Sequence, residues 1–142
     1  MDLMSRIMED EGFRSKVYQC PAGYLTIGYG RNVDPTGGKG ITQSEAITLL
    51  SHDIAECEAD VRDFYGPLLW DRFGLVRQNA LINMRFQLGG AGFRKFKLMH
   101  DAIRQQDWER ASNEAVGSLW ATQTPQRARR IAQELRSGVS LY

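Results

Sequence analysis

The chain has 142 residues, a length typical of one domain with a hydrophobic core of its own. Hydrophobic residues make up 42% of it and charged residues 25%, a globular composition that excludes a disordered or coiled-coil chain. The formal net charge of +1 does not indicate a nucleic-acid-binding protein. No apolar run reaches the roughly 18 residues of a membrane span. We therefore expect neither a nucleic-acid partner nor membrane insertion.

A short helix and a hairpin are expected first in the chain. Apolar residues at helical spacing, followed by Gly12 as a natural C-cap, predict a helix over residues 3–11. Residues 15–30 then change to β-branched and aromatic side chains around the turn sequence Pro-Ala-Gly, which predicts a strand, a tight turn and a returning strand. Residues 31–40 are rich in turn formers and leave room for one further short strand.

Two longer helices are expected next. Thr42 and Glu45 have the spacing of a capping box, which predicts the start of a long helix. Its predicted apolar face comprises Ala46, Leu49, Leu50, Ile54, Cys57 and Val61. Another helix is predicted after Pro67, with Gly89 as its stop.

Shorter helices are predicted in the C-terminal part of the chain. Asp107 is an expected cap for a helix whose apolar stripe runs to Leu119. Thr124 is an expected N-cap and Pro125 an expected first residue of the final helix, which Gly138 ends. One hairpin sheet followed by helices indicates the α+β class, with a sheet lobe joined by the long helix to a helical lobe and a cleft between them.

Glu11 closes the apolar stripe of the first helix, which Met4, Ile7 and Met8 form. Because such a stripe faces the protein interior, we expect the Glu11 carboxyl to be desolvated, which favours its neutral form. A carboxylic acid that stays protonated near neutral pH can protonate a glycosidic oxygen. The alternative is a frayed terminal glutamate that pairs with an arginine.

Cys20 and Thr26 lie on the two strands of the predicted hairpin, where both side chains can face the same side as Glu11. A thiol and a hydroxyl at these positions can hold a water molecule. The alternative for Cys20 is a small buried apolar side chain, since free cysteines are often buried.

These three residues follow the spacing E-x8-[D or C]-x5-T. The segment that contains them, EDEGFRSKVYQCPAGYLTIGYG, closely resembles the catalytic segment of the phage-type lysozymes, glycoside hydrolase family twenty-four. The resemblance continues in the family's order through ITQSEA (41–46), NMRFQLGG (83–90), AGF (91–93) and WATQTPQRARR (120–130), and so covers nearly the whole chain.

The resemblance implies a two-lobed muramidase that hydrolyses the β-1,4 bond between N-acetylmuramic acid and N-acetylglucosamine in peptidoglycan, with no cofactor and no metal. Such proteins are phage endolysins. Carried over by position, Glu11 would be the general acid, Cys20 would stand where an aspartate is more common, and Thr26 would help to position the attacking water. Gln87 and Thr124 match positions near the substrate.

Cys20 leaves the hairpin without a second carboxylate, so three roles stay open for it. We expect a water-orienting group or thiolate base; the others are a covalent thioglycosyl nucleophile and a structural thiol. Inverting hydrolysis needs one group to protonate the leaving oxygen and another to activate water. A thiol with an ordinary pKa of about 8.5 is mostly neutral at pH 7, so Cys20 is a weak base unless a neighbouring charge lowers its pKa.

Charged residues are expected to support this site. By resemblance, Arg127 matches the family arginine that pairs with the catalytic glutamate, and Arg130 is expected to pair with Asp10. The alternative for these arginines is a solvated basic face. Arg31 stands where many relatives have histidine, and Asp53 matches its usual acidic partner, so we expect an ion pair between them.

The resemblance implies a single phage-lysozyme domain over residues 1–142. Its β lobe is expected at about 13–42, its linking helix at about 43–62, and its helical lobe at about 63–142 together with the N-terminal helix. We expect a monomer whose partner is peptidoglycan. Two cysteines and the lack of an export signal favour the host cytoplasm before lysis, with action on the periplasmic cell wall once a holin permeabilises the membrane.

Functions of other classes compete with this interpretation. A catalytically weak peptidoglycan-binding relative would keep the fold but would have lost hydrolysis when the aspartate position became cysteine. A basic nucleic-acid module would rest only on residues 127–130. His52 and His100 lack metal-ligand spacing, so we expect no metal site.

Overall fold

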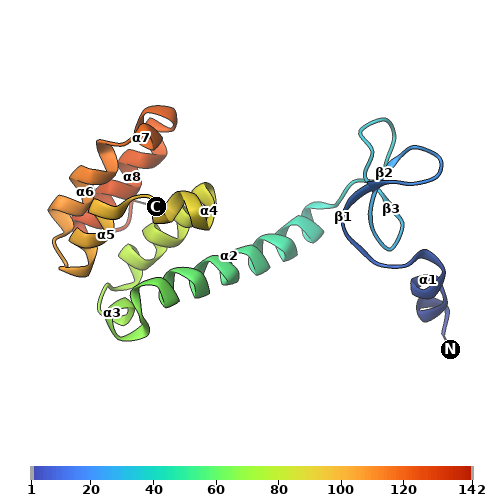
Figure 1. Cartoon of the computed structure of the whole chain (residues 1–142), viewed down its shortest axis with the longest axis horizontal. Coiled ribbons are helices and arrows are strands. Elements are labelled where there is room, and N and C mark those ends of the chain that lie inside the picture. The colour runs from blue at the N-terminus through green and yellow to red at the C-terminus, as the bar shows by residue number, and fades with distance from the viewer. Residues whose placement is uncertain (1, 142) are drawn as a thin grey trace. The chain divides into compact units, whose positions relative to one another are not determined.

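The computed structural model describes residues 2–141 (Figure 1). Contacts within the chain divide it into two compact units, Met1–Leu49 and Leu50–Tyr142, which we name unit 1 and unit 2. Unit 1 holds a short helix and a small sheet, whereas unit 2 is helical, and this confirms the predicted α+β class. The expectation of one domain over residues 1–142, with the N-terminal helix in the helical lobe, stays a prediction.

Unit 1 begins with helix α1 (Leu3–Glu11), as predicted. The Asp2 side chain caps its start by accepting a hydrogen bond from the Ser5 amide at 2.8 Å. Gly12 ends the helix with a φ of +68°, a value that favours glycine, and its amide donates to the Met8 carbonyl. None of the residues of α1 is buried.

The predicted hairpin is present and gains a third strand. The antiparallel sheet has its strands in chain order, β1 (Arg14–Gln19), β2 (Leu25–Gly28) and β3 (Arg31–Asn32). Thr26 lies at its centre, opposite Tyr18 on one side and Asn32 on the other.

The loop after β3 is held by side-chain hydrogen bonds. Asp34 accepts from the Leu25 amide at 3.0 Å, from the Thr36 amide at 2.9 Å and from the Thr36 hydroxyl. The Leu25 amide is the main reason that the pKa of Asp34 lies below its usual value, with the Thr36 contacts adding to it. A Cβ on Gly38 would collide with the Asp34 backbone, so the loop also closes tightly on itself.

Helix α2 (Gln43–Tyr65) starts with the predicted capping box. The Thr42 amide donates to Glu45 at 3.0 Å, and the Glu45 amide donates to the Thr42 hydroxyl oxygen at 3.1 Å. The predicted apolar face is only partly correct, because Cys57 and Val61 are buried while the residues nearer the start are not. Leu49, Leu50 and Ile54 of this predicted face are exposed. Leu49 lines an open hollow on unit 1, and Leu50 and Ile54 line another on unit 2.

Unit 2 continues through α3 (Pro67–Asp71), α4 (Leu75–Arg94), α5 (Lys97–Arg104), α6 (Trp108–Val116), α7 (Leu119–Gln123) and α8 (Pro125–Ser137) (Figure 1). Within residues 2–141, every buried hydrophobic side chain belongs to this unit. The largest fully buried ones include Leu81, Met84, Phe93, Ile103, Ile131 and Leu135. None of the helices in the described chain combines the length and apolar character that crossing a bilayer requires.

The predicted stop at Gly89 is confirmed, since the backbone of this glycine is not helical and α4 consists of two helical segments that meet there at a bend. Gly89 has a φ of +73°, and helical backbone resumes beyond it as far as Arg94. Asp60 of α2 pairs with a residue on each side of the bend, with Arg85 at 2.6 Å and with Arg94. The hydrogen bond from Arg85 is the main reason that the pKa of Asp60 lies below its usual value, and the hydrogen bond from Arg94 adds to it.

Two further predictions are corrected near the C-terminus. Leu119 is exposed and begins α7, because α6 already ends at Val116. Thr124 precedes α8 as predicted but makes no side-chain cap. Its hydroxyl oxygen accepts from the Gln87 amide instead, and its proton is donated to the Trp120 carbonyl at 3.2 Å. The first and last signals of α8, Pro125 and Gly138, are confirmed.

A buried histidine joins three helices of unit 2. The Phe93 carbonyl accepts from His100 Nε2 at 2.7 Å, so the neutral ring leaves Nδ1 to accept from the Tyr65 hydroxyl at 2.6 Å. Burial lowers the pKa of His100 to about 4. Phe64, Tyr65 and Phe93 surround the ring, which makes this the aromatic centre of the core.

Candidate active site

Glu11 is the last residue of α1, and its carboxyl lies against Gly30 in the turn before β3. A Cβ on Gly30 would be 2.5 Å from Glu11 Oε2. Within unit 1 the side chain of Glu11 is exposed, and the expectation that it faces the interior of the whole protein stays a prediction. The apolar stripe of α1, with Met4 and Ile7, is likewise exposed within unit 1.

The turn that follows Cys20 supplies hydrogen-bond donors to its sulfur. The Tyr24 amide has the largest effect, followed by the Ala22 amide, the Thr26 side chain and the Gly23 amide. Together they lower the pKa of the Cys20 thiol below its usual value, against partial burial, which acts in the opposite direction. The cause expected from the sequence was a neighbouring charge, whereas the cause in the structure is hydrogen bonding.

Thr26 is brought next to Cys20 by the hairpin register. Its side chain is buried, and its hydroxyl donates to the Tyr24 carbonyl at 2.9 Å. The same carbonyl accepts from the Cys20 amide at 2.9 Å. A hydroxyl has one proton to donate, so Thr26 can serve either this carbonyl or the Cys20 sulfur at one time. Glu11, Cys20 and Thr26 thus all belong to unit 1 and lie at its sheet or against it.

Gln87 and Thr124, the predicted substrate contacts, meet in unit 2. Gln87 Nε2 donates to the Thr124 hydroxyl oxygen at 3.3 Å, while Gln87 Oε1 accepts from the Trp120 indole at 2.9 Å. These two bonds fix which way the Gln87 amide points. The sequence did not indicate the contact between Trp120 and Gln87, although a buried indole N–H usually finds an acceptor.

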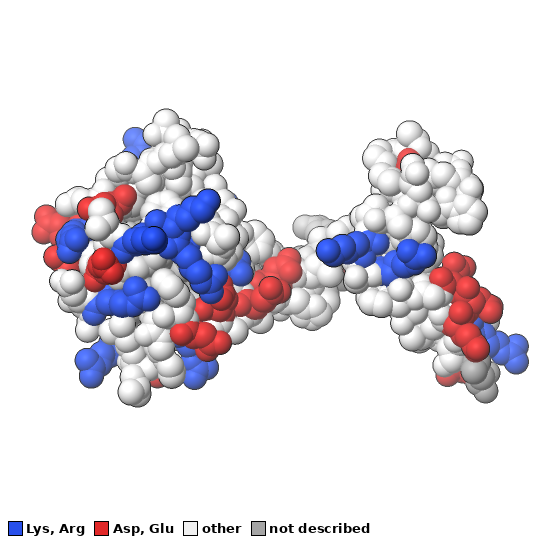
Figure 2. All heavy atoms as spheres, in the orientation of Figure 1, with Lys and Arg blue, Asp and Glu red and all other residues white. Residues whose placement is uncertain are grey.

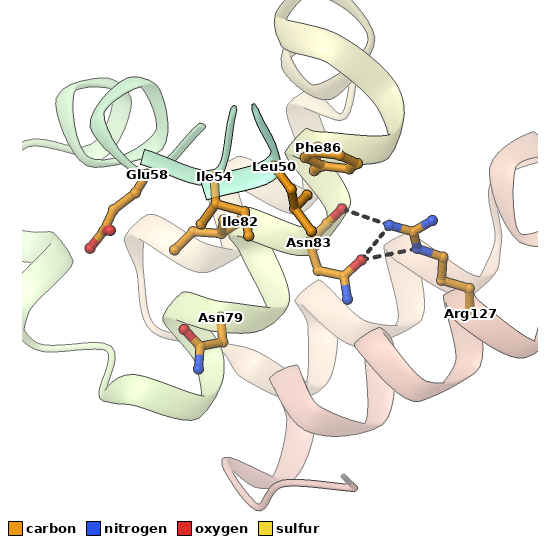
Figure 3. A pocket seen from close by; sticks show the side chains of 8 residues that line it. All are labelled: Leu50, Ile54, Glu58, Asn79, Ile82, Asn83, Phe86 and Arg127. Carbon is orange, nitrogen blue, oxygen red and sulfur yellow. Dashed lines mark hydrogen bonds between the residues drawn. The ribbon is translucent and has the colours of Figure 1, made fainter. Parts of the chain in front are cut away.

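Arg127 lies beside an open hollow of about 410 Å³ on unit 2 (Figure 3). Its guanidinium points to Asn83 and donates to the Asn83 side-chain oxygen through Nε at 2.9 Å and through Nη2 at 2.6 Å. The other residues that line the hollow are Leu50, Ile54, Glu58, Asn79, Ile82 and Phe86.

The predicted pairings of Arg127 with Glu11 and of Arg130 with Asp10 would each join one unit to the other, and they stay predictions. The pairing expected between Arg31 and Asp53 would also join the two units and stays a prediction. Within unit 1, Arg31 forms an ion pair with Glu45 at 2.7 Å and also donates to the Gly40 carbonyl. Glu45 lies at the start of α2 and was not expected as a partner.

Carboxylates gather on one helix of unit 1. In Figure 2 they lie on α1, where Glu9, Asp10 and Glu11 are consecutive, while both signs of charge are visible on each unit. The described residues contain no cluster of His, Cys, Asp and Glu that could hold a metal ion. The chemistry available at the hairpin is therefore that of a carboxyl, a thiol and a hydroxyl.

Comparison with known proteins adds an independent line of support. The family model for phage lysozyme matches residues 8–133, a range that includes every candidate residue from Asp10 to Arg130. The chain is 28% identical to a probable T4-type lysozyme of Dictyostelium discoideum, over 91% of the chain and 90% of that protein. It is 34% identical to an endolysin of Acyrthosiphon pisum secondary endosymbiont phage 1, over 58% of the chain and 54% of the endolysin.

The chain is also similar to part of a much larger protein. It is 35% identical to the pre-baseplate central spike protein Gp5 of Enterobacteria phage T4, over 97% of the chain, but it spans only 28% of the length of that spike protein. The match over residues 8–133 confirms the family, the fold class and the lysozyme enzyme class that the sequence predicted. The chain that places Glu11 at the end of α1, Cys20 directly after β1 and Thr26 on β2 thus belongs to the phage lysozyme family.

Proposed function

We propose that this chain hydrolyses the β-1,4 bond between N-acetylmuramic acid and N-acetylglucosamine in bacterial peptidoglycan. Family membership supports the substrate class. The observation that carries the chemistry is the hairpin geometry, which brings a thiol of lowered pKa next to Thr26 on the sheet against which the Glu11 carboxyl lies. An acid and a water-activating group are the two functions that glycoside hydrolysis requires.

Glu11 is the general acid in this proposal. Its exposed carboxyl is accessible to a glycosidic oxygen, to which it donates its proton as the bond to the sugar breaks. Cys20, as the thiolate, accepts a proton from the water that attacks the sugar, and Thr26 orients that water. The amides around the sulfur favour the thiolate by hydrogen bonding to it.

Residues of unit 2 bind the substrate and support the site in this proposal. The Gln87 amide uses one of its two N–H groups on Thr124 and keeps the other for a sugar or peptide carbonyl. Thr124 contacts the substrate beside it. Arg127, Arg130 and Asp10 are supporting residues through the pairings predicted from the sequence.

The biological role that we propose is that of a phage endolysin, which lyses the host. The protein would act as a monomer, remain in the host cytoplasm until lysis, and reach the periplasmic cell wall through a membrane that a holin has permeabilised. Similarity to a phage endolysin supports this role.

The first test is turbidity loss of permeabilised Gram-negative cells with a reducing agent present throughout. The parent should clear the suspension, and Glu11→Gln should reduce the rate by about 1,000-fold or more, because the amide N–H is not acidic enough to protonate the leaving oxygen. Equal clearing by both proteins would show that Glu11 is not the acid. If neither protein clears the cells but both sediment with purified peptidoglycan, the binding-only relative is correct.

The role of Cys20 is tested by the pH dependence of the rate. The parent rate should rise with pH as the thiolate forms, and Cys20→Ser should lose this rise together with most of the activity. Cys20→Asp restores the residue more common in the family and should stay active without the rise. Identical profiles for the parent and Cys20→Ser would reject the thiolate base and leave the structural thiol.

A further inference from the structure

Gly30 lies in the two-residue turn between β2 and β3, and the Glu11 side chain lies directly against it. A Cβ at this position would be 2.5 Å from Oε2, 2.9 Å from Cδ and 3.4 Å from Cγ of Glu11. The carboxyl group therefore occupies the space that any side chain at residue 30 would need. The close approach involves the outer half of the Glu11 side chain, which is the part that carries the acidic proton.

We propose that Gly30 is a positioning residue for Glu11, whose carboxyl rests on the bare Cα of this glycine. The inference depends on the proposed function, in which Glu11 is the general acid. Glu11 has three side-chain torsions and is exposed at the end of a helix. Contact with the Gly30 backbone on one side reduces the directions in which the carboxyl can turn.

The backbone conformation of Gly30 is a separate reason for a glycine at this position, so the contact with Glu11 must be tested apart from it. Gly30 has a φ of +74°, which favours glycine, but Gly28 in the same hairpin has a φ of +70°. A Cβ on Gly28 would meet nothing within 4 Å. A side chain would therefore strain the backbone at either position, but only a side chain at residue 30 would also collide with the Glu11 carboxyl.

This pair provides a matched experiment, Gly30→Ala against Gly28→Ala, in the full chain. A displacement of a catalytic group by about 1 Å can cost roughly 100-fold in rate. On soluble peptidoglycan fragments, Gly30→Ala should lower kcat by about 100-fold and leave KM within about threefold, since the substrate contacts on unit 2 are unchanged. Gly28→Ala should leave kcat within about threefold. Equal kcat values for the two variants would overturn the proposal.

A second measurement tests the contact without using activity. Any excess fall in melting temperature of Gly30→Ala over Gly28→Ala should be small, because the exposed end of the Glu11 side chain can turn aside, and it should disappear when Glu11→Ala removes the group that collides. An excess that persists in the Glu11→Ala background would overturn the proposal. If Gly30→Ala alone fails to fold, recovery of folding in the double variant supports the contact, and failure of the double variant to fold when Gly28→Ala folds overturns it.

The two proposals fail in different ways. If Glu11→Gln clears cells as well as the parent, the acid is misassigned, and the positioning role is lost with it. If Glu11→Gln is inactive while Gly30→Ala and Gly28→Ala behave alike, the proposed function stands and the role of Gly30 alone is rejected.

Discussion

Units 1 and 2 are stabilised in different ways. The buried apolar side chains of the described chain all lie in unit 2, while Thr26 is the one buried residue among those described in unit 1. Unit 1 instead relies on turn and side-chain hydrogen bonds, such as those that Asp34 accepts. The proposed catalytic residues lie in this hydrogen-bonded part, so their positions depend on backbone turns more than on core packing. Segments with few buried contacts also open at lower free-energy cost than a packed core.

The largest effect on stability is expected in the core of unit 2. Leu81 is fully buried in α4, and Leu81→Ala should lower the free energy of unfolding by about 3 to 4 kcal/mol because it leaves a cavity. Leu75 on the same helix is 70% exposed, and Leu75→Ala should change the free energy of unfolding by less than about 0.5 kcal/mol. Chemical denaturation measures both. Similar losses for the two variants would contradict the contrast drawn between core and surface.

The next largest effect is the pH dependence that His100 gives to unit 2. Its pKa is about 4 in the folded protein and about 6.5 in an unfolded chain, so the unfolded state binds a proton first as the pH falls. Stability should therefore decrease between about pH 6.5 and pH 4, by about 3 kcal/mol from this residue.

His100→Gln tests this effect, because the amide can donate to Phe93 and accept from Tyr65 as the neutral ring does. The loss of stability between pH 7 and pH 4 should be smaller in the variant by about 3 kcal/mol. His52, the other histidine, is present in both proteins. Parallel stability curves for the parent and the variant would show that His100 does not titrate as expected.

A smaller and more local effect is expected in unit 1. Asp34→Ala removes the acceptor for Leu25 and Thr36, so the amide of Leu25 should exchange its hydrogen with solvent faster. Because the pKa of Asp34 is lowered in the folded protein, its contribution persists at neutral pH and is lost as the pH falls through that lowered value. The melting temperature should fall less than in Leu81→Ala. A fall as large as that of Leu81→Ala would remove the contrast between the units.

The smallest effect is expected at the ion pair of Arg31 and Glu45, whose side chains are 31% and 39% exposed. Glu45→Gln keeps an acceptor for the Thr42 amide but loses the charge that attracts Arg31, and exposed ion pairs contribute little. The melting temperature should change by no more than about a degree. Glu45→Ala, which also removes the cap, should lower it more. The reverse order would mean that the ion pair matters more than the cap.

Local signals in the sequence predicted the element boundaries well. Gly12, the capping box at Thr42 and the Pro125 and Gly138 signals all work through neighbouring residues, so no knowledge of the tertiary structure is needed to find them. Whether Glu11 is buried could not be predicted in this way, because an apolar helix stripe is buried only where another element covers it.

The candidate site was predictable in its residues but not in its contacts. The spacing of Glu11, Cys20 and Thr26 identified the family, which the comparison confirms. The amides that surround the Cys20 sulfur depend on the three-dimensional course of the hairpin turn, and Gly30 contacts Glu11 across a gap of 19 residues. Neither contact leaves a periodic pattern in the sequence.

The bend in α4 has a consequence for how unit 2 keeps its shape. Gly89 permits the bend but does not set its angle, since a glycine can adopt many backbone conformations. Asp60 uses one carboxylate oxygen for Arg85, before the bend, and the other for Arg94, after it. Asp60 of α2 thus binds both segments of α4. The two ion pairs of Asp60 thus restrict the angle between the two segments of α4. Phe93 lies on the second segment and is buried in the core, so its orientation depends on the charge of Asp60, which lies outside the core.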